Sequence, residues 1–253
     1  MFSRMCFILL AFPVIAGTPE EEGLRIIIEM DKANNGFSGE YSEMEMTLIN
    51  AHGDKTTRKM ITETIEQDGD GDRSISNFQW PADVKGTRML TWSHKTGDDD
   101  QWLYLPALKR VKRISSRNKS GSFMGSEFSY EDLGSQEVEE YTYKYLDDQT
   151  LDGRSCWRIE RYPVSKKSGY TREVAWFDKE YMNPLKIEYY DRKEELLKVG
   201  LFSKYKKYDQ WWRADEILME NVQTGKKSII SWTVRELGKT FEEEHFSADY
   251  LID

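Results

Sequence analysis

Residues able to perform acid–base or nucleophilic chemistry are present in this chain, but their spacing assembles no recognisable catalytic site. The three histidines, His52, His94 and His245, belong to no spacing that is typical of a metal site. Cys156 lies in a predicted strand beside Trp157, which is typical of a buried, unreactive thiol. The sequence contains no Gly-x-Ser-x-Gly elbow, phosphate-binding loop or Gly-x-Gly-x-x-Gly motif. Because none of the many carboxylate pairs stands out, we expect neither catalysis nor a cofactor.

One acidic motif resembles the start of a calcium-binding loop. Asp68, Asp70 and Asp72 alternate as the first ligands of such a loop would. However, Arg73 stands where a glycine is required, and Gln79 stands where a bidentate glutamate is required. The motif therefore predicts a hairpin turn and no metal site.

A run of basic residues stands out in a chain whose formal net charge is −9. Its first members are Lys109, Arg110, Lys112 and Arg113, and Arg117 and Lys119 follow them. Two interpretations stay open. The lysines would protect an edge strand from aggregation, or the run would dock an acidic partner or anionic lipid headgroups. We expect docking by the first four residues, because the run leads directly into the unusual segment 115–133.

The segment 115–133 has the serine and glycine content of a loop, yet it contains four large apolar residues. A fully solvated loop has little reason to carry Phe123, Met124, Phe128 and Tyr130. We therefore expect it to fold inward as a lid or plug, with a short helix near residues 129–133.

Aromatic and methionine residues give the strongest indication of a ligand. Flexible, polarisable methionines suit a cavity that accepts varied apolar shapes, although an ordinary β-sheet core is the alternative. The predicted lipid-binding residues are Met44, Met46, Leu48, Trp80, Trp92, Trp102, Tyr104, Phe123, Met124 and Phe128.

Residues 1–16 have the marks of a cleaved signal peptide: a basic start at Arg4, an uncharged apolar stretch, and small residues before Gly17. The apolar stretch is shorter than the roughly 20 residues of a membrane-spanning helix. An uncleaved anchor or a buried strand is the alternative. Cys6 lies inside the apolar stretch without a lipobox, so we expect an unlipidated periplasmic protein of residues 17–253.

The composition of the mature chain restricts the classes of molecule that it is expected to bind. Loss of residues 1–16 removes one basic residue, so the chain becomes more acidic, which argues against nucleic acid. Cys156 remains as the single cysteine, so no internal disulfide forms. No later segment is long and apolar enough to span a membrane, and no linker divides residues 17–253, which we interpret as one domain.

The elements expected from the patterns are one helix followed by strands. Thr18 caps the helix, Pro19 and Glu21 fit its first turn, and residues 34–36 end it. Period-2 alternation and turn residues predict strands near residues 44–48, 55–67, 74–80, 87–93, 101–105, 109–115, 141–146, 156–162, 171–177, 185–190, 197–205, 213–220 and 227–235. Their short links favour an antiparallel meander that forms a strongly curved sheet or open barrel.

Two long motifs resemble a known family. Residues 101–114 (QWLYLPALKRVKRI) and 120–133 (SGSFMGSEFSYEDL) are similar to the central motifs of LolA-like outer-membrane lipoprotein-sorting proteins, and Lys85-Gly86-Thr87 fits the pattern too. The resemblance extends from Thr18 to near Tyr250. It implies a mainly β (α+β) fold: an open antiparallel β-barrel or strongly curved sheet of about 11 strands. An N-terminal helix and the lid segment would cover its hydrophobic cavity.

The resemblance also implies a function. LolA-like carriers shuttle acylated lipoproteins between the inner and outer membranes, and the most similar subgroup is associated with RND/MMPL-type exporters. The implied partners are an acylated lipoprotein or free lipid, such an exporter, an outer-membrane acceptor and, transiently, a membrane. The segment 123–128 and the helix would gate the cavity. An envelope sensor or adaptor of the same fold is the alternative, and a glycan-binding or glycan-processing β domain ranks third.

Overall fold

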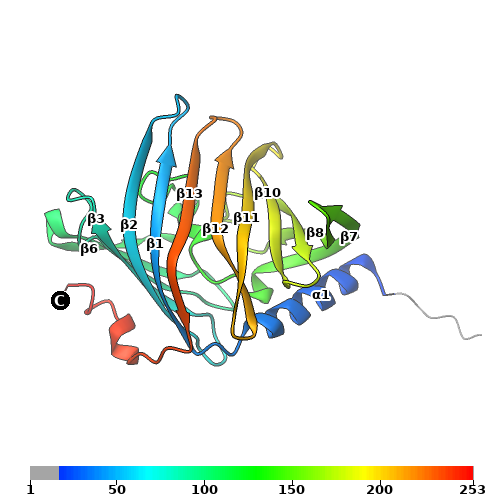
Figure 1. Cartoon of the computed structure of the whole chain (residues 1–253), viewed down its shortest axis with the longest axis horizontal. Coiled ribbons are helices and arrows are strands. Elements are labelled where there is room, and N and C mark those ends of the chain that lie inside the picture. Colours follow the sequence, from blue (N-terminus) through cyan, green and yellow to red (C-terminus); the bar gives the residue numbers. More distant parts are fainter. Residues whose placement is uncertain (1–16, 253) are drawn as a thin grey trace, which may run out of the picture.

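Each of the thirteen segments with a strand pattern becomes a strand of one antiparallel sheet in the computed structural model, which describes residues 17–252. The open, mainly β fold is confirmed, with thirteen strands where about 11 were expected. The sheet is strongly curved, and the single long helix lies along one end of it (Figure 1). The predicted signal peptide, residues 1–16, lies outside the described residues.

The strands follow one another as antiparallel neighbours. In chain order they are β1 (Gly39–Ile49), β2 (Lys55–Ile65), β3 (Arg73–Trp80), β4 (Arg88–Trp92), β5 (Asp100–Leu105), β6 (Arg110–Ile114), β7 (Tyr141–Leu151), β8 (Arg154–Pro163), β9 (Arg172–Asp178), β10 (Asn183–Tyr190), β11 (Leu196–Tyr208), β12 (Trp211–Asn221) and β13 (Lys227–Leu237). Short 3-10 helices are η1 (Pro106–Leu108), η2 (Ser116–Asn118), η3 (Tyr130–Asp132), η4 (Val138–Glu140) and η5 (Glu243–Phe246).

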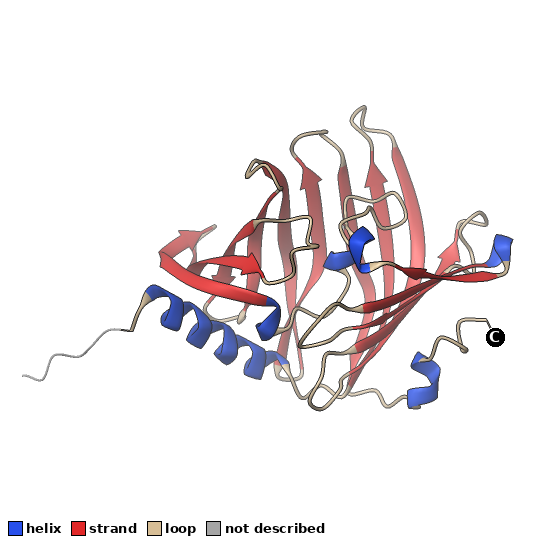
Figure 2. Ribbon diagram, turned by 180° about the vertical axis from the view of Figure 1, so that it is seen from behind, coloured by secondary structure: helices blue, strands red, loops and turns tan. Residues whose placement is uncertain are grey.

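The topology explains why a long segment crosses the sheet. The order of strands is β6-β5-β4-β3-β2-β1-β13-β12-β11-β10-β9-β8-β7, so β1 pairs with β13 and the two edges are β6 and β7. These two edge strands are consecutive in the chain although they lie at opposite ends of the sheet. Residues 115–140 must therefore pass from one edge to the other. Figure 2 shows this connection and the long helix on the same side of the sheet.

The helix α1 (Pro19–Asn34) begins and ends where the capping signals predict. The Thr18 hydroxyl accepts the Glu21 N–H, and the Glu21 carboxylate accepts the Thr18 N–H at 2.8 Å, which completes a capping box. At the other end, Arg213 Nη1 donates to Asn34 Oδ1 at 2.7 Å, and Asn34 Nδ2 donates to the Met182 carbonyl at 2.8 Å. The C-terminal end of the helix is thus fixed to β12 and to the turn before β10.

The N-terminal half of α1 packs directly on the edge strand β7. A Cβ atom built on Gly23 would lie 2.8 Å from the backbone nitrogen of Tyr145, closer than side chains normally approach a backbone. We predict that Gly23→Ala lowers the free energy of unfolding by about 1–3 kcal/mol. The substitution would be favourable by about 1 kcal/mol in an isolated helix. Urea denaturation of the variant measures the sign, and a stabilised variant would contradict the close packing.

The two faces of the sheet are covered differently. On the concave face, α1 and the crossing segment enclose the main core, which includes Ile26, Met46, Phe78 and Ile159. Against the outer face, the segment after β13 buries Phe246 and Leu251 completely, where they pack with side chains of β3 and β4. Trp92 Nε1 donates to the Phe246 carbonyl at 2.7 Å and fixes this segment. Among residues 17–252, no helix is long and apolar enough to cross a membrane.

Candidate functional site

The principal cavity has a volume of about 730 Å³ and lies between α1, the crossing segment and the concave face. Much of its apolar sheet wall comes from β9–β12, which carry Phe177, Ile187, Tyr189, Phe202, Ile217 and Met219. Alternation along each strand places these side chains on one face. Ile27 and Met30 of α1 add to the apolar lining. This volume falls in the range of sites that enclose small apolar ligands.

The cavity opens to solvent near the end of α1. Exposed residues at Asn35 and Gly36, and in the β2–β3 turn at Asp68 and Gly69, belong to its lining. The turn forms where the hairpin was predicted. Beside it, burial, reinforced by nearby carboxylates, raises the pKa of Asp72 to about 7. The opening is therefore acidic, whereas the wall behind it is apolar.

One ion pair lies inside the cavity wall. Arg161 on β8 is 6% exposed, Glu173 on β9 is 1% exposed, and Arg161 Nε donates to Glu173 Oε2 at 2.6 Å. The guanidinium carbon also lies 4.5 Å from the ring centroid of Tyr141. Burial raises the pKa of Glu173, and the charge of Arg161 opposes that rise. The two charges therefore compensate each other inside the cavity wall.

The segment Ser115–Leu133, called the plug segment below, folds inward as predicted. Phe123 is 1% exposed and Phe128 is 4% exposed. The Phe123 ring centroid lies 5.8 Å from those of Phe78 on β3 and Tyr130 in η3. Aromatic packing at such distances contributes beyond simple area burial. The plug segment thus packs on the concave face, where Phe123 contacts Phe78 of β3 and Phe128 lines the cavity.

A buried polar cluster fixes the far end of the plug segment. Lys198 Nζ on β11 donates to Asp132 Oδ2 at 2.6 Å and to the Glu127 carbonyl at 3.2 Å. The Tyr170 hydroxyl donates to Asp132 Oδ1 at 2.9 Å, and the Ser129 N–H donates to Asp132 Oδ2 at 2.6 Å. Lys198 and Asp132 side chains are only 4% and 8% exposed. An ion pair so well shielded from water is costly to break.

The structure places the ten predicted lipid-binding residues in four environments. Phe128 lines the cavity itself. Met44, Met46 and Phe123 lie in the main core, and Leu48 and Met124 pack against it. The remaining four lie elsewhere: Trp92, Trp102 and Tyr104 pack in the second cluster with Phe246 and Leu251, and Trp80 is 51% exposed.

The residues that line the cavity wall on β9–β12 did not stand out in the sequence. Leu218 separates Ile217 from Met219, and Leu201 precedes Phe202, so no contrast with polar neighbours marks these residues. Arg161 and Glu173 lie in charged stretches that resemble solvent-facing strands. Period-2 alternation identifies two faces of a strand but does not say which face becomes concave. The location of the cavity follows from the crossing connection, which is a long-range feature.

The predicted docking residues Lys109, Arg110, Lys112 and Arg113 are all exposed on and beside the edge strand β6. Arg113 pairs with Asp100. Within residues 17–252, the side chains of the other three form neither an ion pair nor a hydrogen bond. Leu108, in the β5–β6 turn, is 63% exposed. The exposed apolar side chain of Leu108 is thus followed directly by basic side chains that no acidic group among these described residues neutralises.

Comparisons with known proteins agree with this architecture. A domain from Vibrio parahaemolyticus described as an outer-membrane lipoprotein-sorting protein domain is 47% identical, with a TM-score of 0.91, 92% of this chain covered and 100% of the other. A DUF1329 family protein from Desulfovibrio piger is 33% identical, with a TM-score of 0.88, 93% of this chain covered and 100% of the other.

A more distant structure shares the fold. The LolA superfamily protein NE2245 from Nitrosomonas europaea is 17% identical, with a TM-score of 0.72, 90% of this chain covered and 99% of the other. A family model described as "Uncharacterized protein" matches residues 70–253. No curated protein matches the sequence. At 47% identity to the Vibrio parahaemolyticus domain, the chain belongs to the family of outer-membrane lipoprotein-sorting proteins, and its open sheet has the LolA-like fold.

Proposed function

We propose that this protein is a periplasmic carrier that holds the acyl chains of a lipoprotein or lipid in its cavity and moves them between the inner and outer membranes. The observation that carries the proposal is the cavity of about 730 Å³ beneath α1 and the plug segment, whose wall on β9–β12 is apolar. Each methylene moved from water into such a cavity contributes about 0.8 kcal/mol. One long acyl chain is therefore held by several kcal/mol without any covalent step, and the protein acts by binding and not as an enzyme.

Release requires that the cover can move. The sheet is open, and α1 and the plug segment are the elements that enclose the cavity. We propose that the stretch 123–128 of the plug segment and α1 gate the cavity. Deletion of residues 120–125 would then change the rates of loading and release of a fluorescent fatty acid. Unchanged rates for both steps would contradict gating by this segment.

A substitution in the wall tests the cavity directly. Ile217 lines the cavity and is partly exposed within it. We predict that Ile217→Trp weakens binding of a fluorescent fatty acid by about tenfold or more. Exclusion of two methylenes, at about 0.8 kcal/mol each, is sufficient for that loss.

Leu201 supplies the matched control for this experiment. It lies on β11, next to the strand of Ile217, but is 40% exposed. We expect Leu201→Trp to leave the fatty-acid affinity within about twofold of the original. Equal affinities for the original protein and the Ile217→Trp variant would argue against acyl binding in this cavity. Fluorescence titration at equilibrium gives all three constants.

The basic residues of β6 are proposed to bring the carrier to anionic lipid headgroups during exchange. The supporting observation is the exposed Leu108 followed by Lys109, Arg110 and Lys112, none of which is neutralised by another described residue. The exchange partners are proposed to be an RND/MMPL-type exporter in the inner membrane and an acceptor in the outer membrane, as the family resemblance implies.

We predict that reversing three charges of this patch (Lys109→Glu, Arg110→Glu, Lys112→Glu) weakens cosedimentation with phosphatidylglycerol vesicles by about 100-fold. The reason is that each basic side chain near an anionic membrane contributes about 1 kcal/mol. The control reverses three exposed lysines elsewhere: Lys166, Lys193 and Lys207. If both triple variants lose the same affinity, net charge and not this patch attracts the protein. Unimpaired binding by the first variant would contradict recruitment to anionic lipid by this patch.

A further inference from the structure

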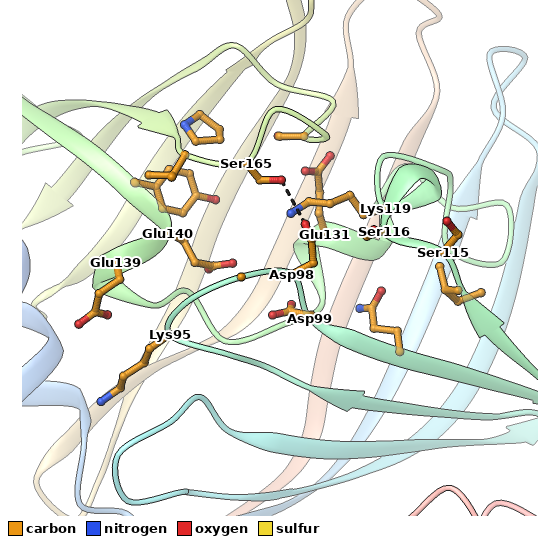
Figure 3. A pocket seen from close by; sticks show the side chains of 17 residues that line it. Lys95, Asp98, Asp99, Ser115, Ser116, Lys119, Glu131, Glu139, Glu140 and Ser165 are labelled. Atoms are coloured by element: carbon orange, nitrogen blue, oxygen red, sulfur yellow. Dashed lines mark hydrogen bonds between the residues drawn. The ribbon is translucent and has the colours of Figure 1, made fainter.

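A second, smaller pocket lies beside the cavity and has a different chemical character. Its volume is about 250 Å³, and its lining comes from the β4–β5 loop, both ends of the plug segment, η4 and the β8–β9 loop. Figure 3 shows the carboxylates of Asp99, Glu131 and Glu140, which come from three of these segments. In contrast to the apolar wall of the main cavity, these side chains suit a hydrophilic group.

The two spaces adjoin each other. Tyr141 and Lys95 line both the polar pocket and the main cavity. Tyr141 is held between them, because its hydroxyl donates to Gln136 Oε1 at 3.1 Å and its ring lies against the Arg161 guanidinium. A molecule whose hydrocarbon occupies the cavity can therefore extend a polar end past Tyr141 into the pocket. This is the geometry that an amphiphile requires.

The pocket holds negative charge that its own basic residues do not neutralise. Asp98 is paired, since Lys167 Nζ lies 2.6 Å from its Oδ2. Asp99, Glu131 and Glu140 have no basic group within ion-pair distance among the residues that the structure describes. Burial raises the pKa of Asp99 and of Glu131, and raises that of Glu140 to about 7. A positive group placed among these carboxyls would supply the missing counter-charge.

Two lysines at the pocket reduce this negative charge without cancelling it. Lys119 lowers the pKa of Asp99 and of Glu140, against the larger effect of burial. Lys95 lines the pocket at its border with the cavity. Both lie opposite four carboxylates that lack an ion pair, because Glu139 adds to the three already named. The pocket thus remains acidic overall.

A buried amide points to the same kind of ligand independently. Gln101 on β5 lines the pocket and is only 4% exposed. Its Nε2 donates to the Tyr130 carbonyl at 2.9 Å, but its Oε1 accepts no hydrogen bond from any residue between 17 and 252. Buried amide oxygens normally accept a hydrogen bond. The unused acceptor belongs to the lining of the pocket, together with the carboxyls of Asp99, Glu131 and Glu140, so a ligand that brings N–H donors would satisfy it.

We propose that this pocket binds the protonated amine of a headgroup whose acyl chains occupy the main cavity, so that the cargo is an amine-bearing acylated amphiphile. The inference rests on the proposed carrier function. It specifies the polar end of the cargo, which the apolar cavity does not select. The amine belongs either to a free aminolipid or to the polypeptide portion of an acylated protein.

The test compares single-chain competitors that differ only in their polar end. N-phenyl-1-naphthylamine is bound first, and decylamine, decanol and decanoate are then titrated below their micellar concentrations. We expect decylamine to displace the probe at a concentration about tenfold or more below that of decanol, because charge-assisted hydrogen bonds are the stronger ones. Decanoate should be the weakest of the three, because like charges repel.

Paired variants assign the preference to the pocket. Glu131→Gln with Glu140→Gln keeps the side-chain shapes and should reduce the preference for decylamine over decanol to about twofold or less. The control pair, Glu194→Gln with Glu195→Gln, alters exposed carboxylates at the β10–β11 turn and should keep the full preference. Equal displacement by decylamine and decanol in the original protein, or a preference that survives in the first pair, would overturn the inference.

The failure of the carrier function has a different signature. If neither the naphthylamine probe nor decanol binds, the cavity itself takes no hydrocarbon, and both proposals fall together. If both bind without a preference for the amine, only the headgroup inference falls. Mass spectrometry of an organic extract of the protein from its own host then identifies the source of the amine. An aminolipid passes into the extract, whereas an acylated polypeptide stays with the protein; a cargo without any amine contradicts the inference.

Discussion

Lys198→Met is expected to lower the free energy of unfolding by about 3–5 kcal/mol, because it leaves the Asp132 carboxylate buried without its counter-charge. The two side chains are 4% and 8% exposed, and their charged atoms lie 2.6 Å apart. The loss should fall first on the plug segment, since Asp132 belongs to that segment and Lys198 belongs to the wall. Urea denaturation gives the total, and amide hydrogen exchange of residues 120–133 shows where protection disappears.

A second substitution distinguishes the contribution of the ion pair to stability from that of side-chain packing. Adding Asp132→Asn to Lys198→Met removes the uncompensated charge but keeps an amide that can accept the Tyr170 hydroxyl, now 2.9 Å from Asp132 Oδ1. We expect this double variant to recover all but about 1–2 kcal/mol, the cost of the hydrogen bonds still lost. If Lys198→Met alone costs less than about 1 kcal/mol, or if the double variant is the less stable of the two, the ion pair does not fix the plug segment.

Phe123→Ala is the second substitution with a large expected effect. The ring is 1% exposed and packs between Phe78 and Tyr130, so its removal leaves a cavity in the main core. Truncation of a buried phenylalanine to alanine costs about 3–5 kcal/mol. The same variant should load a fluorescent fatty acid faster, since a loosened plug segment uncovers the cavity.

The control for Phe123→Ala is Val222→Ala. Val222 is 45% exposed at the β12–β13 turn, so its truncation should change stability by less than about 0.5 kcal/mol and leave the loading rate unchanged. Stopped-flow fluorescence measures loading, and thermal or urea unfolding measures stability. A Phe123→Ala protein that is much less stable but loads at the original rate would restrict Phe123 to a structural role.

Local patterns in the sequence are sufficient to locate the elements of this fold. The capping box at Thr18 places the start of α1 to the residue, because the cap is satisfied by groups within the first turn. The strands are identified by alternation and by turn residues between them. The bounds differ most at β1, which begins at Gly39, and at β7, which extends to Leu151 past the expected end near residue 146, where a register shift follows Tyr145.

The local sequence patterns did not predict contacts between segments that are far apart in the chain. Trp102 and Tyr104 alternate as wall residues should, yet they face the second cluster, which includes Phe246 and Leu251 from the segment after β13. No pattern near β5 in the sequence indicates that a segment more than a hundred residues away packs over its outer face. The plug segment, in contrast, was recognisable, because four large apolar residues in a serine- and glycine-rich stretch require an interior.

The buried charges illustrate a second limit. Arg161, Glu173 and Lys198 occur in stretches rich in charge, where solvent exposure is the common outcome. Their burial depends on the curvature of the sheet, which brings β8, β9 and β11 beneath the crossing connection. The same curvature creates the polar pocket and the cavity side by side. The site is therefore a property of the topology, while the elements are a property of local sequence.

Native mass spectrometry with lipid extraction, on protein purified from its own host, tests the central claim most directly. We predict a bound acylated species at about one per chain, which the Ile217→Trp variant binds less well and the Leu201→Trp variant retains. A protein that is empty when isolated and also fails to take up a fluorescent fatty acid would contradict the carrier function, and would favour an envelope sensor or adaptor built on the same fold.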